Sequence, residues 1–113
     1  MRKSRLNLCG GITLDNYAVK LYAQAYRDLD GIYSYIANEL LEPNAALNLV
    51  NELEGAILSL EQMPDRGAVR RVGLFANSGY RQLFVKNYII IYRVLREQKE
   101  VHIVTIRYMA SDF

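Results

Sequence analysis

The sequence predicts an α+β fold of order βααβββ, with a helical hairpin packed on one face of an antiparallel sheet. Two stretches between residues 23 and 63 repeat apolar side chains at three- and four-residue steps, as amphipathic helices do. Three apolar stretches beyond residue 79 are separated by short turns, as in an antiparallel meander. With 113 residues the chain fits one domain, which we place at residues 16–113 after a flexible N-terminal extension over residues 1–15.

The helical half is delimited by its two prolines. After a short alternating strand at residues 17–22, the first helix should span residues 23–41. Pro43 ends that helix and opens the second, which should run to residue 63 before Pro64. The expected core stripes are Tyr26, Leu29, Tyr33, Ile36 and Leu40 in the first helix, and Ala46, Val50, Leu53, Ile57 and Leu60 in the second.

The second half should form three strands, at residues 80–85, 88–96 and 100–107. The turns between them fall at Lys86-Asn87 and at residues 97–99, and such short connections make the neighbours antiparallel. The helices must cover one face of this sheet, and the other face can stay open to solvent or to a partner. Because a buried cation without a partner is costly, we expect the open face to present Arg81 and the ends of the neighbouring strands.

Charge is distributed unevenly along the chain. Residues 1–63 sum to −3 and residues 64–113 to +5, which together give the net charge of +2. A basic second half predicts an anionic partner, either nucleic acid or an acidic protein segment.

Several classes of protein are excluded by composition. A single cysteine, Cys9, excludes an internal disulfide, and with one histidine a structural zinc site is not expected. We therefore expect no metal and no cofactor. No apolar run approaches the roughly 18 residues of a membrane span, so we expect a cytoplasmic protein without membrane contact.

An ordered set of short motifs resembles the RelE/ParE family of bacterial toxins, also labelled plasmid-stabilisation proteins, from about residue 16 to residue 113. The residues that carry the resemblance are Tyr26-Arg27-Asp28-Leu29, Ile32 and Tyr35-Ile36; Pro43, Ala46, Leu53, Ile57, Leu60 and Pro64; Tyr80-Arg81, Leu83, Val85, Asn87-Tyr88, Ile91-Tyr92 and Val94; and Val101, Ile103-Val104, Ile106 and Asp112.

The resemblance implies the toxin of a type II toxin–antitoxin pair, which inhibits growth until a small cognate antitoxin binds it. The RelE-like branch of the family cleaves messenger RNA on the ribosome, whereas the ParE-like branch inhibits DNA gyrase without known hydrolytic chemistry. Both targets stay open here, as does a degenerate toxin that only binds its antitoxin in operon autoregulation. A homodimer and a heterotetramer with the antitoxin are open as well.

Metal-free RNA cleavage would need a base, cations on the phosphate and an acid for the leaving oxygen. The candidate catalytic residues are Arg81, Arg107 and Tyr108, and the candidates for RNA or target binding are Arg70, Arg71 and Lys86. Arg81 has an alternative structural role, pairing with Asp28 or Glu39. His102, the single histidine, is expected to be structural.

The chain departs from the RelE-like pattern just after the last strand. Where that branch often carries a basic tail, this sequence reads Ala110-Ser111.

Overall fold

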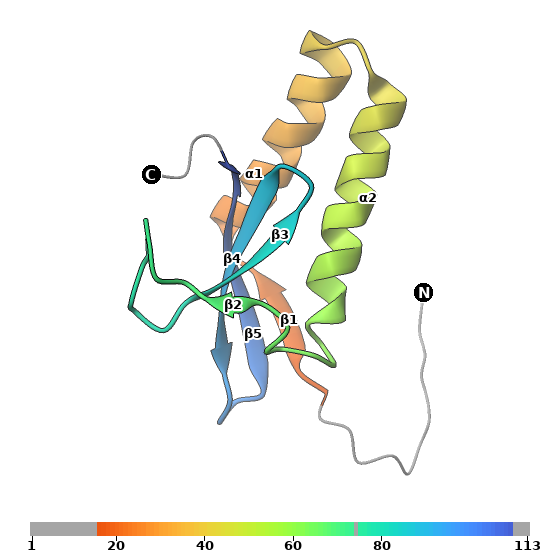
Figure 1. Cartoon of the computed structure of the whole chain (residues 1–113). Helices are drawn as coiled ribbons and strands as arrows, with labels where there is room; N and C mark the ends of the chain where they lie inside the picture. Colours follow the sequence, from red (N-terminus) through yellow and green to blue (C-terminus); the bar gives the residue numbers. More distant parts are fainter. Residues whose placement is uncertain (1–15, 74, 110–113) are drawn as a thin grey trace.

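A computed structural model of the chain describes residues 16–73 and 75–109 (Figure 1). The elements are β1 (Ala18–Leu21), α1 (Ala23–Ser34), a π-helical turn η2 (Tyr35–Glu39), α2 (Pro43–Ser59), β2 (Ala68–Val69), β3 (Arg81–Val85), β4 (Tyr88–Leu95) and β5 (Glu100–Tyr108). The expected N-terminal extension and the tail that includes Ala110-Ser111 lie outside the described residues.

The α+β fold is confirmed, and its sheet is mixed rather than purely antiparallel. The strand order is β1-β5-β4-β3-β2, and β3, β4 and β5 form the expected antiparallel meander. β1 runs parallel to β5, with Ala18 opposite Glu100 and Leu21 opposite Ile103. The helical hairpin returns the chain to the meander, whose last strand offers β1 an open edge to pair with.

Two local features of the sheet were not expected. β2 lies between α2 and the meander, where the sequence predicts no strand, and it pairs antiparallel with the first two residues of β3. The ladder between β4 and β5 shifts register after Ile91, since Ile91 pairs with Thr105 but Tyr92 pairs with Ile103. Val104 is the extra residue of this bulge, and the bulge changes which side chains of β5 share a face.

The helices begin and end close to the predicted positions. α1 continues into η2 and the chain turns at Leu41, whose φ of 57° lies in the left-handed region. Pro43 opens α2 at its first turn, where a missing N–H costs no hydrogen bond. α2 ends at Ser59, earlier than predicted, and hydrogen-bonded turns carry the chain on to Met63.

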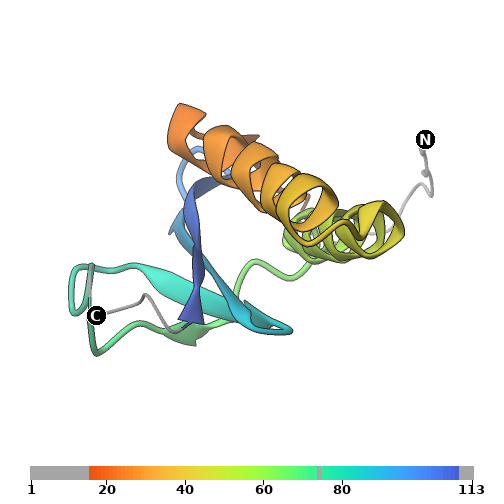
Figure 2. The same cartoon turned by 90° about the horizontal axis from the view of Figure 1, so that it is seen from above.

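Both helices pack on one face of the sheet (Figures 1 and 2). The stripe predicted for α2 is largely confirmed: Ala46, Leu53, Ile57 and Leu60 are buried, and Val50 is half-buried.

The stripe predicted for α1 and its continuation is right at two positions and wrong at three. Leu29 is buried and Ile36 is half-buried, whereas Tyr26, Tyr33 and Leu40 are 61%, 39% and 51% exposed. Ala25 is buried and Ile32 packs against the core in place of the two tyrosines. Small Ala25 lets the helix approach the sheet closely, and the two tyrosines keep their hydroxyls in water.

The face of the sheet opposite the helices is not open as predicted. Ile90 and Tyr92 belong to the core under the helices, so strand alternation places Ile89 and Ile91 on the other face. Both are buried, at 4% and 0% exposure. The connection from β2 to β3 runs on that side of the sheet, away from the helices (Figure 2). There Tyr80 contacts the guanidinium of Arg93, with its ring centroid 5.7 Å from Cζ.

Candidate functional site

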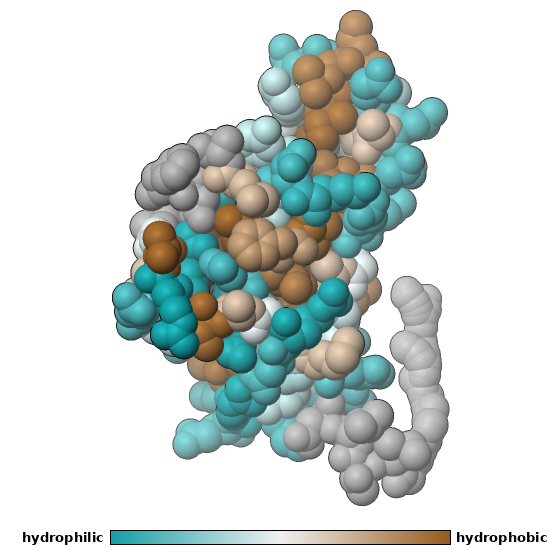
Figure 3. All heavy atoms as spheres, in the orientation of Figure 1, coloured by the Kyte–Doolittle hydropathy of each residue, from teal (hydrophilic) through white to brown (hydrophobic). Residues whose placement is uncertain are grey.

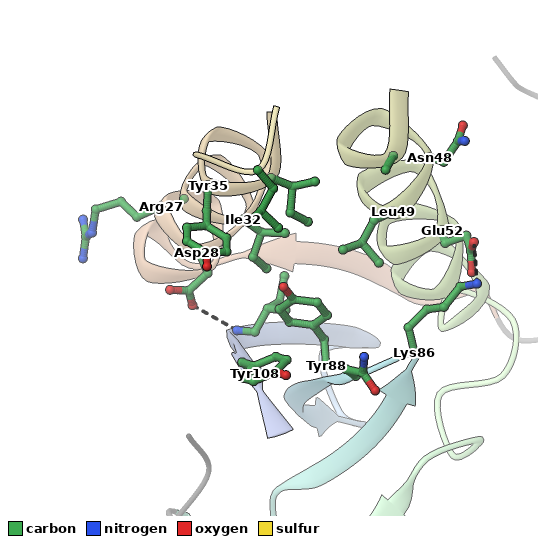
Figure 4. Close-up of a pocket in the computed structure, with 16 residues that line it drawn as sticks. Arg27, Asp28, Ile32, Tyr35, Asn48, Leu49, Glu52, Lys86, Tyr88 and Tyr108 are labelled. Carbon is green, nitrogen blue, oxygen red and sulfur yellow. Dashed lines mark hydrogen bonds and ion pairs between the residues drawn. The ribbon is translucent and has the colours of Figure 1, made fainter. Parts of the chain in front are cut away.

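A groove opens between the helices and the end of the sheet, where the turn from β3 to β4 approaches them (Figure 4). We call it the helix–sheet groove; its volume is about 1010 Å³. Its lining residues are Arg27, Asp28, Gly31, Ile32, Tyr35, Ile36, Leu40, Ala45, Asn48, Leu49, Glu52, Lys86, Asn87, Tyr88, Ile106 and Tyr108. The lining is therefore mostly aliphatic and aromatic, with charged groups at its edges, as in sites that bind an apolar ligand or peptide segment.

Two tyrosines form the sheet side of the groove. Tyr88 of β4 pairs with Tyr108 of β5, and their rings meet edge to face at 5.5 Å between centroids. Burial raises the pKa of Tyr88, and the nearby phenols of Tyr108 and Tyr35 raise it further. Its ring is thus held neutral at physiological pH, which suits an apolar contact.

The charged groups at the edges have different roles. Asp28 accepts hydrogen bonds from the backbone N–H of Ile106 at 3.0 Å and from Thr105 Oγ1 at 2.5 Å. β1 covers β5 only as far as Ile103, so Asp28 of α1 caps the edge of β5 beyond it. Asp28, which the sequence places outside the helix stripe, is therefore structural. Lys86 and Glu52, by contrast, form an exposed ion pair at 3.5 Å.

Hydrophobic side chains also reach the surface along the helical hairpin. Figure 3 shows them gathered on its upper part, above the sheet. Leu40, at the end of η2, is 51% exposed and lines the helix–sheet groove. An exposed apolar surface next to a groove is typical of a protein-binding site.

The three candidate catalytic residues do not come together. Arg81 pairs with Tyr92 and shares a face with Leu83, so it lies on the helix side of the sheet. Arg107 pairs with Ile89 and follows core residue Ile106, so it lies on the opposite side. The expectation that Arg81 belongs to the face opposite the helices is therefore wrong.

Distance along the sheet separates them further. The partners of Arg81 and Arg107 on β4 are Tyr92 and Ile89, three residues apart, which is about 10 Å at 3.3 Å per residue. Tyr108 is 48% exposed and lies in the helix–sheet groove. Arg81 forms its ion pair with Asp65 at 3.7 Å, and not with Asp28 or Glu39.

The three candidate target-binding residues are also dispersed. Arg70 is only 1% exposed, and its guanidinium donates to Gln82 Oε1 at 2.7 Å. It is thus held inside the fold and is not presented to a partner in this structure. Arg71 is exposed on the loop after β2, whereas Lys86 is at the edge of the helix–sheet groove.

His102 belongs to a chain of polar contacts that links β1 to β5. Its Nδ1 lies 3.0 Å from the Tyr22 hydroxyl and its Nε2 lies 2.9 Å from Glu100 Oε1. Glu100 in turn pairs with Lys20 at 2.8 Å, and Lys20 first, then His102, lowers the pKa of its carboxyl. Both ring nitrogens of His102 are engaged, so the imidazole is structural here.

No group of side chains suited to holding a metal ion occurs within residues 16–73 and 75–109. In the same part of the chain, no helix has the length and apolar character to cross a membrane.

Comparison with solved structures places this fold among the toxins of toxin–antitoxin systems. A chain of the chromosomal ParDE system from P. aeruginosa is 27% identical, with a TM-score of 0.68, over 83% of this chain and 97% of that one. A chain of the RelBE2 toxin–antitoxin complex from Mycobacterium tuberculosis is 22% identical (TM-score 0.56; 82% and 98% covered). A chain of the intact E. coli RelBE complex is 11% identical (TM-score 0.57; 81% and 95% covered). A comparison with curated protein sequences gave no significant match.

The family itself is shown by sequence. Residues 19–113 match the family described as the ParE toxin of the type II toxin–antitoxin system, parDE. The chain belongs to this ParE toxin family. It is therefore the toxin of a type II toxin–antitoxin system, and the resemblance read from its motifs is confirmed.

Proposed function

We propose that this toxin stops growth by binding DNA gyrase and not by cleaving messenger RNA. The observation that carries the proposal is the placement of Arg81 and Arg107 on opposite faces of the sheet. Charge stabilisation of one phosphate requires cations within contact distance of that phosphate, and two arginines on opposite faces cannot both reach it. The match to the ParE family agrees with this choice, because gyrase is the target expected for the ParE-like branch.

His102 and Tyr108 do not supply the acid–base chemistry that RNA cleavage would need. His102 is engaged at both nitrogens by Tyr22 and Glu100, so it is poorly placed to act as the base that removes a 2′-hydroxyl proton. Tyr108 contacts Tyr88 in the helix–sheet groove, on the other face of the sheet from Arg107. A protein that inhibits its target by binding needs a complementary surface. It does not need catalytic side chains gathered at one point.

We further propose that the helix–sheet groove binds an apolar segment of the antitoxin. Its lining of aliphatic and aromatic side chains suits an amphipathic helix or an extended segment with apolar anchors. Lys86 and Glu52 at its edge offer both signs of charge to flanking polar residues of that segment. Since gyrase is a cytoplasmic enzyme, toxin and antitoxin would meet in the cytoplasm.

Parallel assays of the two targets test the proposal. Purified toxin is added to gyrase supercoiling reactions and to translating ribosomes on which new messenger RNA ends are mapped. Blocked supercoiling with intact messenger RNA is expected. Cleavage that Arg81→Ala or Arg107→Ala abolishes would contradict the proposal and assign the chain ribonuclease activity.

A third outcome would favour the binding module considered from the sequence. A chain that captures its antitoxin but leaves both gyrase and messenger RNA untouched, and cells growing, would be a degenerate toxin acting in operon autoregulation.

A further inference from the structure

We propose that Arg81 and Arg96, which both pair with Asp65, form a binding site for the phosphates of a nucleic-acid strand. We call these three residues the arginine cluster. It lies where the chain leaves α2 and meets the start of β3 and the turn after β4. Neither Arg81 nor Arg96 lines the helix–sheet groove, and the proposal does not depend on the function proposed for the toxin.

The cluster is built on a rigid support. The buried Tyr92 hydroxyl donates to the carbonyl of Pro64 and accepts from the N–H of Gly67, both at 2.9 Å. A Cβ on Gly67 would lie 2.4 Å from the carbonyl oxygen of Gln82 and 2.6 Å from the Tyr92 oxygen, so glycine permits this close approach. Residues 64–67 are thereby tied to the sheet, which fixes the position of Asp65 relative to Arg81.

The cations of the cluster outnumber its carboxylate. Asp65 contacts Arg96 closely and Arg81 at 3.7 Å, and these contacts, led by the hydrogen bond from Arg96, lower the pKa of its carboxyl. Arg66, the next residue along the chain, donates instead to the hydroxyl of Ser59 on α2 at 2.7 Å and is not part of the cluster. One carboxylate against the two guanidinium groups that contact it leaves a local excess of one positive charge.

Arg81 is the least satisfied member of the cluster. Its ion pair with Asp65 is too long for a hydrogen bond, and its buried Nε finds no hydrogen-bond partner among the described residues. The side chain is nevertheless 20% exposed, and with Nε buried this exposure belongs to its other atoms. Asp65 is meanwhile engaged mainly by Arg96. An incoming anion would therefore supply Arg81 with the charge-assisted hydrogen bonds that Asp65 does not.

A nucleic-acid strand is the anion that fits this surface best. An acidic peptide would also need an apolar groove for its anchors, whereas contacts to phosphate require only exposed cations on a rigid frame. Arg96 is exposed, and the cluster lies within the half of the chain that carries a net charge of +5. That half would attract a polyanion from a distance and the cluster would hold its phosphates.

The salt dependence of binding to a fluorescein-labelled 12-nucleotide single-stranded DNA tests the site. Each phosphate contact on a single strand contributes about −0.7 to the slope of log K against log salt concentration. Arg81→Gln and Arg96→Gln are each expected to weaken binding and to make the slope shallower by about 0.7. Lys20→Gln, an equal change in charge on β1, should alter neither quantity by that amount.

Asp65→Asn should change DNA binding in the opposite direction to the arginine variants. Because Asp65 competes with phosphate for Arg81 and Arg96, its neutralisation is expected to tighten DNA binding by several-fold, beyond the effect of the charge-matched control Glu97→Gln. Urea denaturation of every variant verifies that it is folded.

Three results would overturn the proposal. The first is an unchanged salt slope in both folded arginine variants. The second is tighter binding of a polyglutamate peptide than of the DNA, which would assign the cluster to an acidic protein partner. The third is stabilisation by inorganic phosphate without binding of the labelled strand, which would reduce the site to one for free phosphate.

Discussion

At the residue scale, Tyr92 has an exceptional part in this small fold. It is fully buried, belongs to the core under the helices, and uses its hydroxyl to hold two backbone groups of the loop after α2. The sequence suggests an apolar strand residue at this position. The partners of its hydroxyl, Pro64 and Gly67, are more than twenty residues away and could not be inferred from local patterns.

Removal of that hydroxyl should be costly. Tyr92→Phe leaves the N–H of Gly67 and the carbonyl of Pro64 without their buried partner, and each such loss costs about 1–3 kcal/mol. We expect the free energy of unfolding in urea to fall by at least about 1 kcal/mol. Tyr26→Phe, at a side chain that is 61% exposed, is the matched control and should change it little. Equal stability of the two variants would show that the hydrogen bonds of Tyr92 contribute nothing.

Tyr92 should also make the stability of the protein depend on pH in the alkaline range. Burial raises the pKa of Tyr92, and burial also raises that of Tyr88. A phenol whose pKa is higher in the folded state keeps its full stabilisation below the unfolded value of about 10 and loses it as pH rises beyond that. Unfolding free energies measured from pH 8 to pH 11.5 should therefore decline above about pH 10, and Tyr92→Phe should decline less steeply. A steeper decline in the variant would contradict the assignment to Tyr92.

At the scale of elements, prediction from sequence succeeded where one periodic pattern dominated. α2 has a single apolar stripe, and the residues predicted for that stripe are buried or half-buried. Its start at Pro43 is also as predicted, whereas it ends at Ser59, ahead of Pro64. The two-residue turn at Lys86-Asn87 fixed the register of β3 and β4, with Val85 opposite Tyr88. In α1 two stripes compete, because Tyr26 and Tyr33 fit the helical pattern as well as Ala25 and Ile32, which are the residues that pack on the core.

Prediction failed where non-local pairing decides the structure. β1 could join either edge of the meander in either direction, and β2 has only two residues, too few for an alternating pattern. The burial of Arg70 depends on Gln82, a partner from another element. The candidate catalytic set failed for a related reason. The bulge at Val104 and the placement of the helices decide which face each arginine occupies, and neither can be read from the sequence.

The attachment of α1 to β5 gives a prediction about these two elements. Asp28→Ala removes the acceptor of the Ile106 N–H and of the Thr105 hydroxyl. We expect a loss of about 1–3 kcal/mol in unfolding free energy and faster hydrogen exchange at the Ile106 amide. Asp30→Ala, at an exposed carboxylate on the same helix, is the control. Unchanged exchange at Ile106 in Asp28→Ala would show that the contact does not protect this edge of the sheet.

At the scale of the whole molecule, different surfaces serve different proposed partners. The helix–sheet groove lies at the end of the sheet near the turn between β3 and β4, while the arginine cluster lies where β3 begins and β4 ends. The first is mostly apolar, whereas the second carries two arginines against one carboxylate. Such a separation would let an antitoxin bind the groove while the cluster still holds an anionic strand, so a change at one surface should leave the other intact.

That separation is tested by a charged substitution in the groove. Leu40→Arg introduces a cation at a side chain that is 51% exposed and lines the helix–sheet groove, so folding should be preserved. We expect its affinity for the antitoxin to fall at least tenfold, since an apolar segment would have to meet a charge without a partner. Inhibition of gyrase by the free toxin and binding of single-stranded DNA should not change. Val72→Arg, on the loop after β2 at 80% exposure, adds the same charge away from the groove and should bind the antitoxin normally. Isothermal titration of antitoxin into each folded variant measures the difference, and equal affinities would show that the antitoxin binds elsewhere.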